Sequence, residues 1–224
     1  MNSVAAMRTY KELKDLGIRE ANGYFQRFSE FLKETIATRS WNFIDIEKRR
    51  NEVIEVANAI DLLIYYLNKT RTDRKIMIIG NGGSAGIAMH ALQDYANIGG
   101  LKTLDFYGPA LLTCMANDYG YENVFSKPIE MFAESGDRLF AISSSGKSPN
   151  ILNACESALA KGCYIVTFSG FSPDNPLRKL GNLNFYVPST HYGFVELAHQ
   201  VLIHCILDLF IREKIYEEER ELLG

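Results

Sequence analysis

The four histidines are the first residues to consider for chemistry, because imidazole both binds metals and exchanges protons near neutral pH. His191, His199 and His204 fall within 14 residues of one another, whereas His90 stands alone. Such a group invites a metal-binding or an acid–base hypothesis. Taken by itself, His90 is better interpreted as a helix histidine with ordinary hydrogen-bond partners, so spacing alone defines no site.

Two short segments carry residue types that bind phosphate. Residues 80–85 (GNGGSA, the glycine loop) and 143–148 (SSSGKS, the serine loop) each stand between an expected strand and an expected helix. Glycines let the backbone approach a ligand, and free amides at a helix N-terminus attract phosphate. The serine loop adds four hydroxyls and a lysine. Because ligands of open parallel sheets bind beyond the carboxyl ends of the strands, both loops predict a phosphate-binding edge.

Each loop has another interpretation. Residues 80–85 also fit the G-x-G-x-x-A fingerprint of dinucleotide sites, with Asp105 at a suitable separation to bind a ribose. Residues 141–148 differ from a phosphate-binding P-loop at one position, because Ala141 stands where the first glycine belongs. Either loop can also be a tight turn between a strand and a helix. These alternatives stay open at the level of the loops.

Composition favours a soluble protein with one core. The 224 residues are 47% apolar and 23% charged, with a formal net charge of −3, which argues against a protein that coats nucleic acid. We find no signal peptide and no apolar run of the ~20 residues that a membrane helix needs, so we expect a cytoplasmic protein without a membrane partner. The cysteines, of which none forms a CxxC pair, are expected to be buried free thiols in a reducing compartment: Cys114, Cys155, Cys163 and Cys205.

The order of the expected elements predicts the fold class. Apolar runs of strand length alternate with helical patterns after residue 75, which is typical of a doubly wound α/β protein with a five-stranded parallel sheet. We expect two long helices before it, at 10–37 and 46–69, the second from the apolar spacing of residues such as Val53 and Ile54. The expected strands are 75–80, 102–106, 138–143, 163–170 and 183–188, and the later helices are 84–97, 122–133, 149–161 and 192–217.

This order suggests two regions. We expect residues 1–70 to form an N-terminal helical arm that packs on the core or on a partner subunit. Residues 71–224 are then expected to form the sheet domain.

Three stretches together resemble the SIS (sugar isomerase) domain family, and within it the phosphoheptose isomerases. They are GNGGSAGIAMH (80–90), ANDYGYENVFS (116–126) and ISSSGKSPN (142–150), with weaker support from VELAHQVLIH (195–204). The resemblance implies the SIS fold and conversion of sedoheptulose 7-phosphate into a heptose 7-phosphate. It also implies a cytoplasmic homotetramer with interfacial active sites that supplies heptose for lipopolysaccharide or capsule.

The resemblance also assigns site residues. It implies zinc, or another divalent metal, bound by His90, Asp94, Glu196 and His204, with Asp94 as the base and His204 as the acid. The residues that would bind the sugar or its phosphate are Asn81, Gly82, Gly83, Ser84, Asn117, Asp118, Ser143, Ser144, Ser145, Ser148 and Glu196.

Helical geometry is compatible with these assignments. His90 and Asp94 are four residues apart and therefore share a helix face. Glu196 and His204 are linked by steps of four through Gln200. His199 points about 140° away from His204 at ~100° per residue, so we interpret His199 as a packing residue.

The chain departs from the family pattern in the site itself. The family normally has glutamate where this chain has Asp94, and glutamine where it has Glu196. No arginine follows the first site helix, at residues 95–100, and the usual acidic residue before the last helix is missing near Gly193. These departures bear on the substrate more than on the fold.

Three functions follow in order of preference. The first is a metal-dependent aldose–ketose isomerase that acts through an enediol. The second is a non-catalytic SIS protein that senses a sugar phosphate or binds a protein partner. The third, a nicotinamide-dependent oxidoreductase, is disfavoured because it leaves the serine loop without a role.

Overall fold

Five parallel strands form the centre of the fold, as the sequence predicts. The computed structural model describes residues 11–41, 50–69 and 73–223. The parallel strands are β3 (Lys75–Ile79), β4 (Lys102–Leu104), β5 (Arg138–Ser143), β6 (Tyr164–Ser169) and β7 (Leu183–Tyr186). They lie in the order β7-β6-β5-β3-β4. Strands β5 and β6 are buried almost throughout, which explains their continuous apolar sequences.

Two antiparallel strands extend this sheet to seven strands. β1 (Ile36–Trp41) pairs with β7, and β2 (Arg50–Ile54) pairs with β1. The expected helix over 10–37 is therefore wrong at its end, and it is also interrupted at residues 16–20; that over 46–69 is wrong where β2 forms. The apolar spacing of Val53 and Ile54 fits a helix, but pairing with β1 determines their conformation.

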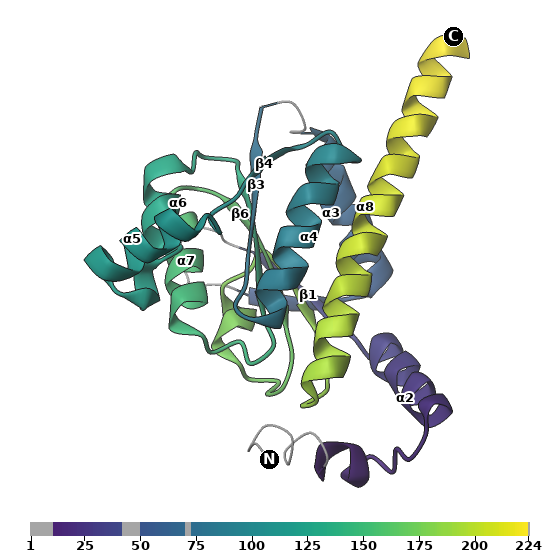
Figure 1. The fold of residues 1–224 in the computed structure, drawn as a ribbon. Coiled ribbons are helices and arrows are strands. Elements are labelled where there is room, and N and C mark those ends of the chain that lie inside the picture. Colours follow the sequence, from purple (N-terminus) through teal and green to yellow (C-terminus); the bar gives the residue numbers. More distant parts are fainter. Residues whose placement is uncertain (1–10, 42–49, 70–72, 224) are drawn as a thin grey trace.

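Helices cover both faces of the sheet, as expected for a doubly wound fold (Figure 1). One face packs against α3 (Val56–Lys69), α4 (Gly83–Asn97) and α8 (Tyr192–Leu223). The other packs against α5 (Pro109–Tyr119), α6 (Ser126–Phe132) and α7 (Pro149–Ala160). No helix was expected over α5. The expected helix over 122–133 is the short 3₁₀ helix η2 (Tyr121–Asn123) followed by α6, and a second 3₁₀ helix, η3 (Pro176–Lys179), precedes β7.

The N-terminal segment packs on α8 of its own chain. Residues 11–15 are helical, and α2 (Ala21–Lys33) follows after a turn at Gly17, whose φ is +70°. The rings of Tyr24 and Phe31 lie 4.5 and 5.4 Å from that of Phe194, near the start of α8. The proposed division at residues 70–71 stays a prediction, but the described part of residues 1–70 is not a purely helical arm, because it contributes β1 and β2 to the sheet.

Two expectations from composition need correction. Tyr192–Tyr216 is long and apolar enough to cross a membrane by length and composition, contrary to the expectation of no such run, but half of its apolar window is buried inside the fold. That burial is typical of a core helix. All four cysteines are free, but Cys114 is exposed on α5, and Cys205 is only partly buried.

Candidate active site

The glycine and serine loops meet at one edge of the sheet. They follow β3 and β5, which are adjacent and parallel, so both loops leave the same edge. A Cβ added at Gly80 would lie 2.6 Å from the carbonyl carbon of Ser84, so the chain can begin α4 this tightly only with glycine. Gly146, with φ at +61°, gives the serine loop its turn.

A cavity of about 240 Å³ lies between the two loops and the start of α8. Nine of the eleven residues expected to bind the sugar or its phosphate line this cavity, together with Ile142 and Tyr192. The nine are Asn81, Gly82, Gly83, Ser84, Ser143, Ser144, Ser145, Ser148 and Glu196.

The serine loop provides hydrogen-bond donors at the start of α7. Its backbone turns on itself, because the Gly146 amide donates to Ser143 Oγ at 3.2 Å, and Ser143 Oγ lies 3.4 Å from Ser148 Oγ. Ser144 Oγ is buried and has no hydrogen-bond partner in the described parts of the chain. An unpartnered buried hydroxyl is unfavourable, and a ligand oxygen would satisfy it. The positive end of the α7 dipole favours an anion at the same place.

Glu196 places a carboxylate in this cavity. A Cβ added at Gly83 would lie 2.5 Å from Glu196 Oε2, so the carboxylate rests against the glycine loop. Burial raises the pKa of Glu196, because removal of water disfavours its charged form. The cavity therefore combines anion-binding hydroxyls with a carboxylate that is easier to protonate than an exposed one.

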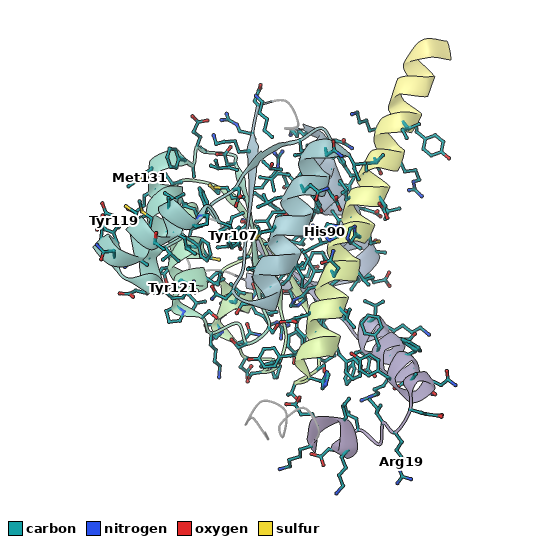
Figure 2. All side chains as sticks on the ribbon, viewed as in Figure 1. Arg19, His90, Tyr107, Tyr119, Tyr121 and Met131 are labelled. Atoms are coloured by element: carbon teal, nitrogen blue, oxygen red, sulfur yellow. The ribbon has the colours of Figure 1, made fainter. Side chains whose placement is uncertain are left out.

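A separate cluster of two histidines and one carboxylate joins α4 to α8. His90 Nε2 lies 3.2 Å and His204 Nδ1 lies 3.9 Å from Asp94 Oδ2, and the imidazole rings are 5.1 Å apart between centroids. His90 points from α4 towards α8 (Figure 2). One potential ligand atom from each residue lies within 4.8 Å of the others. Two imidazoles and a carboxylate suit zinc, and catalytic zinc sites commonly have three protein ligands.

The remaining expected residues lie elsewhere. Glu196 is not part of the His90–Asp94–His204 cluster but lines the neighbouring cavity. Asn117 and Asp118 are exposed on α5 and are not among the residues that line the cavity; the Asn117 amide donates to Asp118 Oδ1 at 2.8 Å.

The other two histidines pack inside the fold. His199 is fully buried, and its Nε2 lies 3.1 Å from the carbonyl oxygen of Ser169. His191 is also buried; its Nδ1 accepts a hydrogen bond from the Phe194 amide, and its ring packs against Tyr24.

Three residues that contact the glycine loop were not singled out from the sequence. Asn150 and Tyr121 bond the side chain of Asn81, and Tyr107 bonds the backbone of Gly80. Asn150 and Tyr121 stand inside two of the stretches that carry the family resemblance. Their position in those stretches was the only available signal, because the contacts join residues 27 to 69 positions apart.

Another, larger cavity among the described residues is a less suitable candidate for this chemistry. It measures about 790 Å³ and lies at the opposite edge of the sheet, where Arg138, Tyr164 and Asn182 stand at the beginnings of strands. Ligands of open parallel sheets bind at the carboxyl edge instead. The 240 Å³ cavity and the histidine cluster are therefore the candidate active site.

Comparison with known proteins identifies the family of the chain. The model of a family described as SIS domain matches residues 43–170. A phosphoheptose isomerase from Cytophaga hutchinsonii is 34% identical over 185 residues, which are 80% of this chain and 92% of the relative. The solved phosphoheptose isomerase of Neisseria gonorrhoeae is 28% identical with a TM-score of 0.62, covering 69% of this chain and 84% of that one. The Francisella tularensis phosphoheptose isomerase, at 23% identity, shows the same fold with a TM-score of 0.70, over 85% and 96% of the two chains.

A parallel sheet with a glycine loop and a serine loop at its carboxyl edge, together with these matches, defines the class: the chain belongs to the SIS domain family. Within that family, its relatives at 31 to 34% identity over most of the chain are named phosphoheptose isomerase.

Proposed function

We propose that the protein is an aldose–ketose isomerase that converts sedoheptulose 7-phosphate into a heptose 7-phosphate through an enediol. One observation carries this proposal: α4 and α8 each contribute residues both to the 240 Å³ cavity beside the serine loop and to the histidine cluster, which lies farther along the same two helices. Ser84 and His90 are about 9 Å apart along α4, and Glu196 and His204 about 12 Å apart along α8, at 1.5 Å per residue. An open-chain sugar phosphate can span such a distance, with its phosphate at one end and its carbonyl at the other.

The serine loop would anchor the phosphate. The free Ser144 hydroxyl and the amides at the start of α7 are donors for its oxygens. Binding energy at this remote group can orient the reacting carbons without taking part in the reaction. Asn81 and Glu196, on the wall of the cavity, would contact the sugar hydroxyls.

Asp94 and His204 would transfer the protons. Isomerisation moves a proton between adjacent carbons, so it needs a base at carbon and an acid at oxygen. The Asp94 carboxylate would take the proton from carbon and return it to the neighbouring carbon. His204 would donate a proton to the carbonyl oxygen and take one from the neighbouring hydroxyl. Asp94 is largely buried, which keeps bulk water from exchanging the proton during transfer.

The same cluster supports metal dependence. His90, Asp94 and His204 would hold zinc or another divalent ion, with Glu196 as the expected fourth ligand only if its side chain turns from the cavity. The ion would polarise the substrate carbonyl and its neighbouring hydroxyl. Metal ligand and catalytic base are competing roles for Asp94. The metal content of Asp94→Ala, compared with that of the wild type, distinguishes them.

We also propose a cytoplasmic homotetramer that supplies heptose for lipopolysaccharide or capsule, without a nucleic-acid or membrane partner. Apolar side chains exposed beside the cluster support a subunit contact there. Met89, Leu197 and Val201 are 51%, 45% and 40% exposed on α4 and α8. A partner copy on this face would bury them and close the site.

Turnover of sedoheptulose 7-phosphate, with metal analysis of the purified protein, tests the proposal. Asp94→Ala and His204→Ala are expected to abolish isomerisation while binding of inorganic phosphate persists. Gln93→Ala, an exposed neighbour of Asp94, is the matched control and should keep full activity. Full activity in both site variants would refute the mechanism.

Asp94 and Glu196 stand where the family normally has glutamate and glutamine, and this difference supports the alternative function, a non-catalytic SIS protein. A wild-type protein that binds sedoheptulose 7-phosphate without turnover and carries no metal would be a sugar-phosphate-sensing regulator or an adaptor. The experiment therefore separates the two functions by turnover and metal content.

A further inference from the structure

An amide pair joins the two loops of the site. Asn150 lies in the first turn of α7, two residues after the end of the serine loop, and is 2% exposed. Its Nδ2 donates to Asn81 Oδ1 at 2.9 Å, and Asn81 Nδ2 donates to Asn150 Oδ1 at 2.9 Å. The pair therefore bridges the ends of β3 and β5 with two hydrogen bonds.

Tyr121 completes the partners of Asn81. Its hydroxyl donates to Asn81 Oδ1 at 3.1 Å, from η2 on the side of the sheet that α5 and α6 cover (Figure 2). An asparagine side chain offers two acceptor lone pairs and two N–H donors. Asn150 and Tyr121 occupy both lone pairs, and Asn150 takes one donor. One N–H of Asn81 is left for the cavity that this residue lines.

Tyr107 fixes the backbone of the glycine loop at Gly80, the residue before Asn81. The Tyr107 hydroxyl accepts from the Gly80 amide at 2.6 Å and donates to the Gly80 carbonyl oxygen at 3.0 Å. Burial raises the pKa of Tyr107, so its hydroxyl keeps the proton that the second bond needs. With Gly80 fixed by its backbone, the direction of the Asn81 side chain depends on Asn150 and Tyr121.

We propose that Asn150 and Tyr121 are positioning residues: they orient Asn81 so that its remaining N–H donates to the sugar phosphate bound beside the serine loop. The inference rests on the proposed function for the identity of that ligand. It assigns Asn150 no contact with the substrate, so its whole effect passes through Asn81.

A double-mutant cycle tests this dependence. We expect Asn150→Ala to lower kcat/KM for sedoheptulose 7-phosphate about tenfold, or about 1.4 kcal/mol, largely through KM. In an Asn81→Ala background the same change should cost less than twofold, because the side chain it orients is gone. Equal losses in both backgrounds would overturn the proposal, since a merely structural role of Asn150 does not depend on Asn81. The affinity for inorganic phosphate, which reports the serine loop, should change less than twofold in every variant.

Tyr121→Phe provides a second test that does not threaten folding. Tyr121 is 57% exposed, and we expect loss of its hydroxyl to lower kcat/KM about threefold. Tyr119→Phe removes a hydroxyl from a neighbouring exposed tyrosine and should have no effect. Asn182→Ala removes an equally buried side-chain amide at the opposite edge of the sheet, where its Oδ1 accepts from the Ile165 amide. This control should lower stability but leave KM unchanged. Indistinguishable kinetics of Tyr121→Phe and wild type would also count against the proposal.

The outcomes separate this inference from the proposed function. If the wild-type protein binds sedoheptulose 7-phosphate without turning it over, the proposed function fails. The double-mutant cycle of Asn150 and Asn81 then tests the inference through the dissociation constant for this sugar phosphate. If the wild-type protein does not bind this sugar phosphate, both fail.

Discussion

Protonation of His199 should control the pH dependence of stability. The side chain is fully buried and donates from Nε2 to the carbonyl oxygen of Ser169. Its Nδ1 is buried without a hydrogen-bond partner in the described residues. Burial lowers the pKa of His199 from 6.5 to about 4, because the charged ring cannot be hydrated there. The folded protein therefore keeps His199 neutral where the unfolded chain protonates it.

The magnitude follows from this difference in pKa. Between pH 6.5 and 4 the unfolded state binds more protons than the folded state, so the free energy of unfolding falls as the pH falls. Each pKa unit is worth 1.36 kcal/mol, so the full effect is about 3 kcal/mol, of which about 2 kcal/mol is lost between pH 7 and pH 5. Below pH 4 the folded state also takes the proton, and the loss from this residue levels off.

Urea unfolding of wild type and His199→Gln across this pH range measures the effect. Glutamine can keep the hydrogen bond to Ser169 but does not titrate. We expect the wild type to lose about 2 kcal/mol more than the variant between pH 7 and pH 5. Burial also lowers the pKa of His191, but that residue is present in both proteins and cancels. Equal losses in the two proteins would refute the reasoning.

Two further predictions concern the glycine loop and the cavity. Gly80→Ala should lower the free energy of unfolding by 2 kcal/mol or more, roughly, since its Cβ would overlap the Ser84 backbone. Gly86→Ala in α4, whose Cβ would meet nothing within 4 Å, should raise the free energy of unfolding by up to about 1 kcal/mol. Thermal or urea unfolding measures both variants, and a Gly80→Ala protein more stable than Gly86→Ala would contradict both predictions. Glu196→Gln should tighten binding of inorganic phosphate about threefold or more at neutral pH, because it removes a negative charge from the cavity. Since burial raises the pKa of Glu196, the two proteins should converge as the pH falls; calorimetry that shows equal affinities at every pH would exclude this effect.

The parallel strands were predictable because their sequences report burial directly. Runs such as residues 138–143 are apolar on both faces and end in a glycine- or serine-rich loop. β1 and β2 were missed because β1 depends on pairing with β7, more than 100 residues away, and β2 depends in turn on pairing with β1. α5 was also missed, although Pro109 at its start and Gly120 after its end are ordinary boundary signals.

The segments that contribute to the candidate site were predictable from the sequence, but the relative positions of their side chains were less so. The two loops on which the resemblance rests line one cavity, whereas their roles in binding stay a prediction. Eight residues of helix turn a side chain about 80° from its starting direction, so Glu196 and His204 face different spaces although steps of four connect them. The contact of Asn150 with Asn81 was not predictable for another reason. It joins residues 69 positions apart, and no local spacing encodes such a contact.

The two outer strands limit how copies of this chain can associate. β4 has only three residues, beginning with the exposed Lys102, and β2 presents Glu52, which is paired with Arg39, on the opposite margin. Short or charged margins discourage the backbone hydrogen bonding by which sheets of separate molecules merge and aggregate. Both margins of the sheet therefore disfavour its growth between copies. If copies of this chain associate, we expect them to do so through the helical faces, which can close into a finite complex.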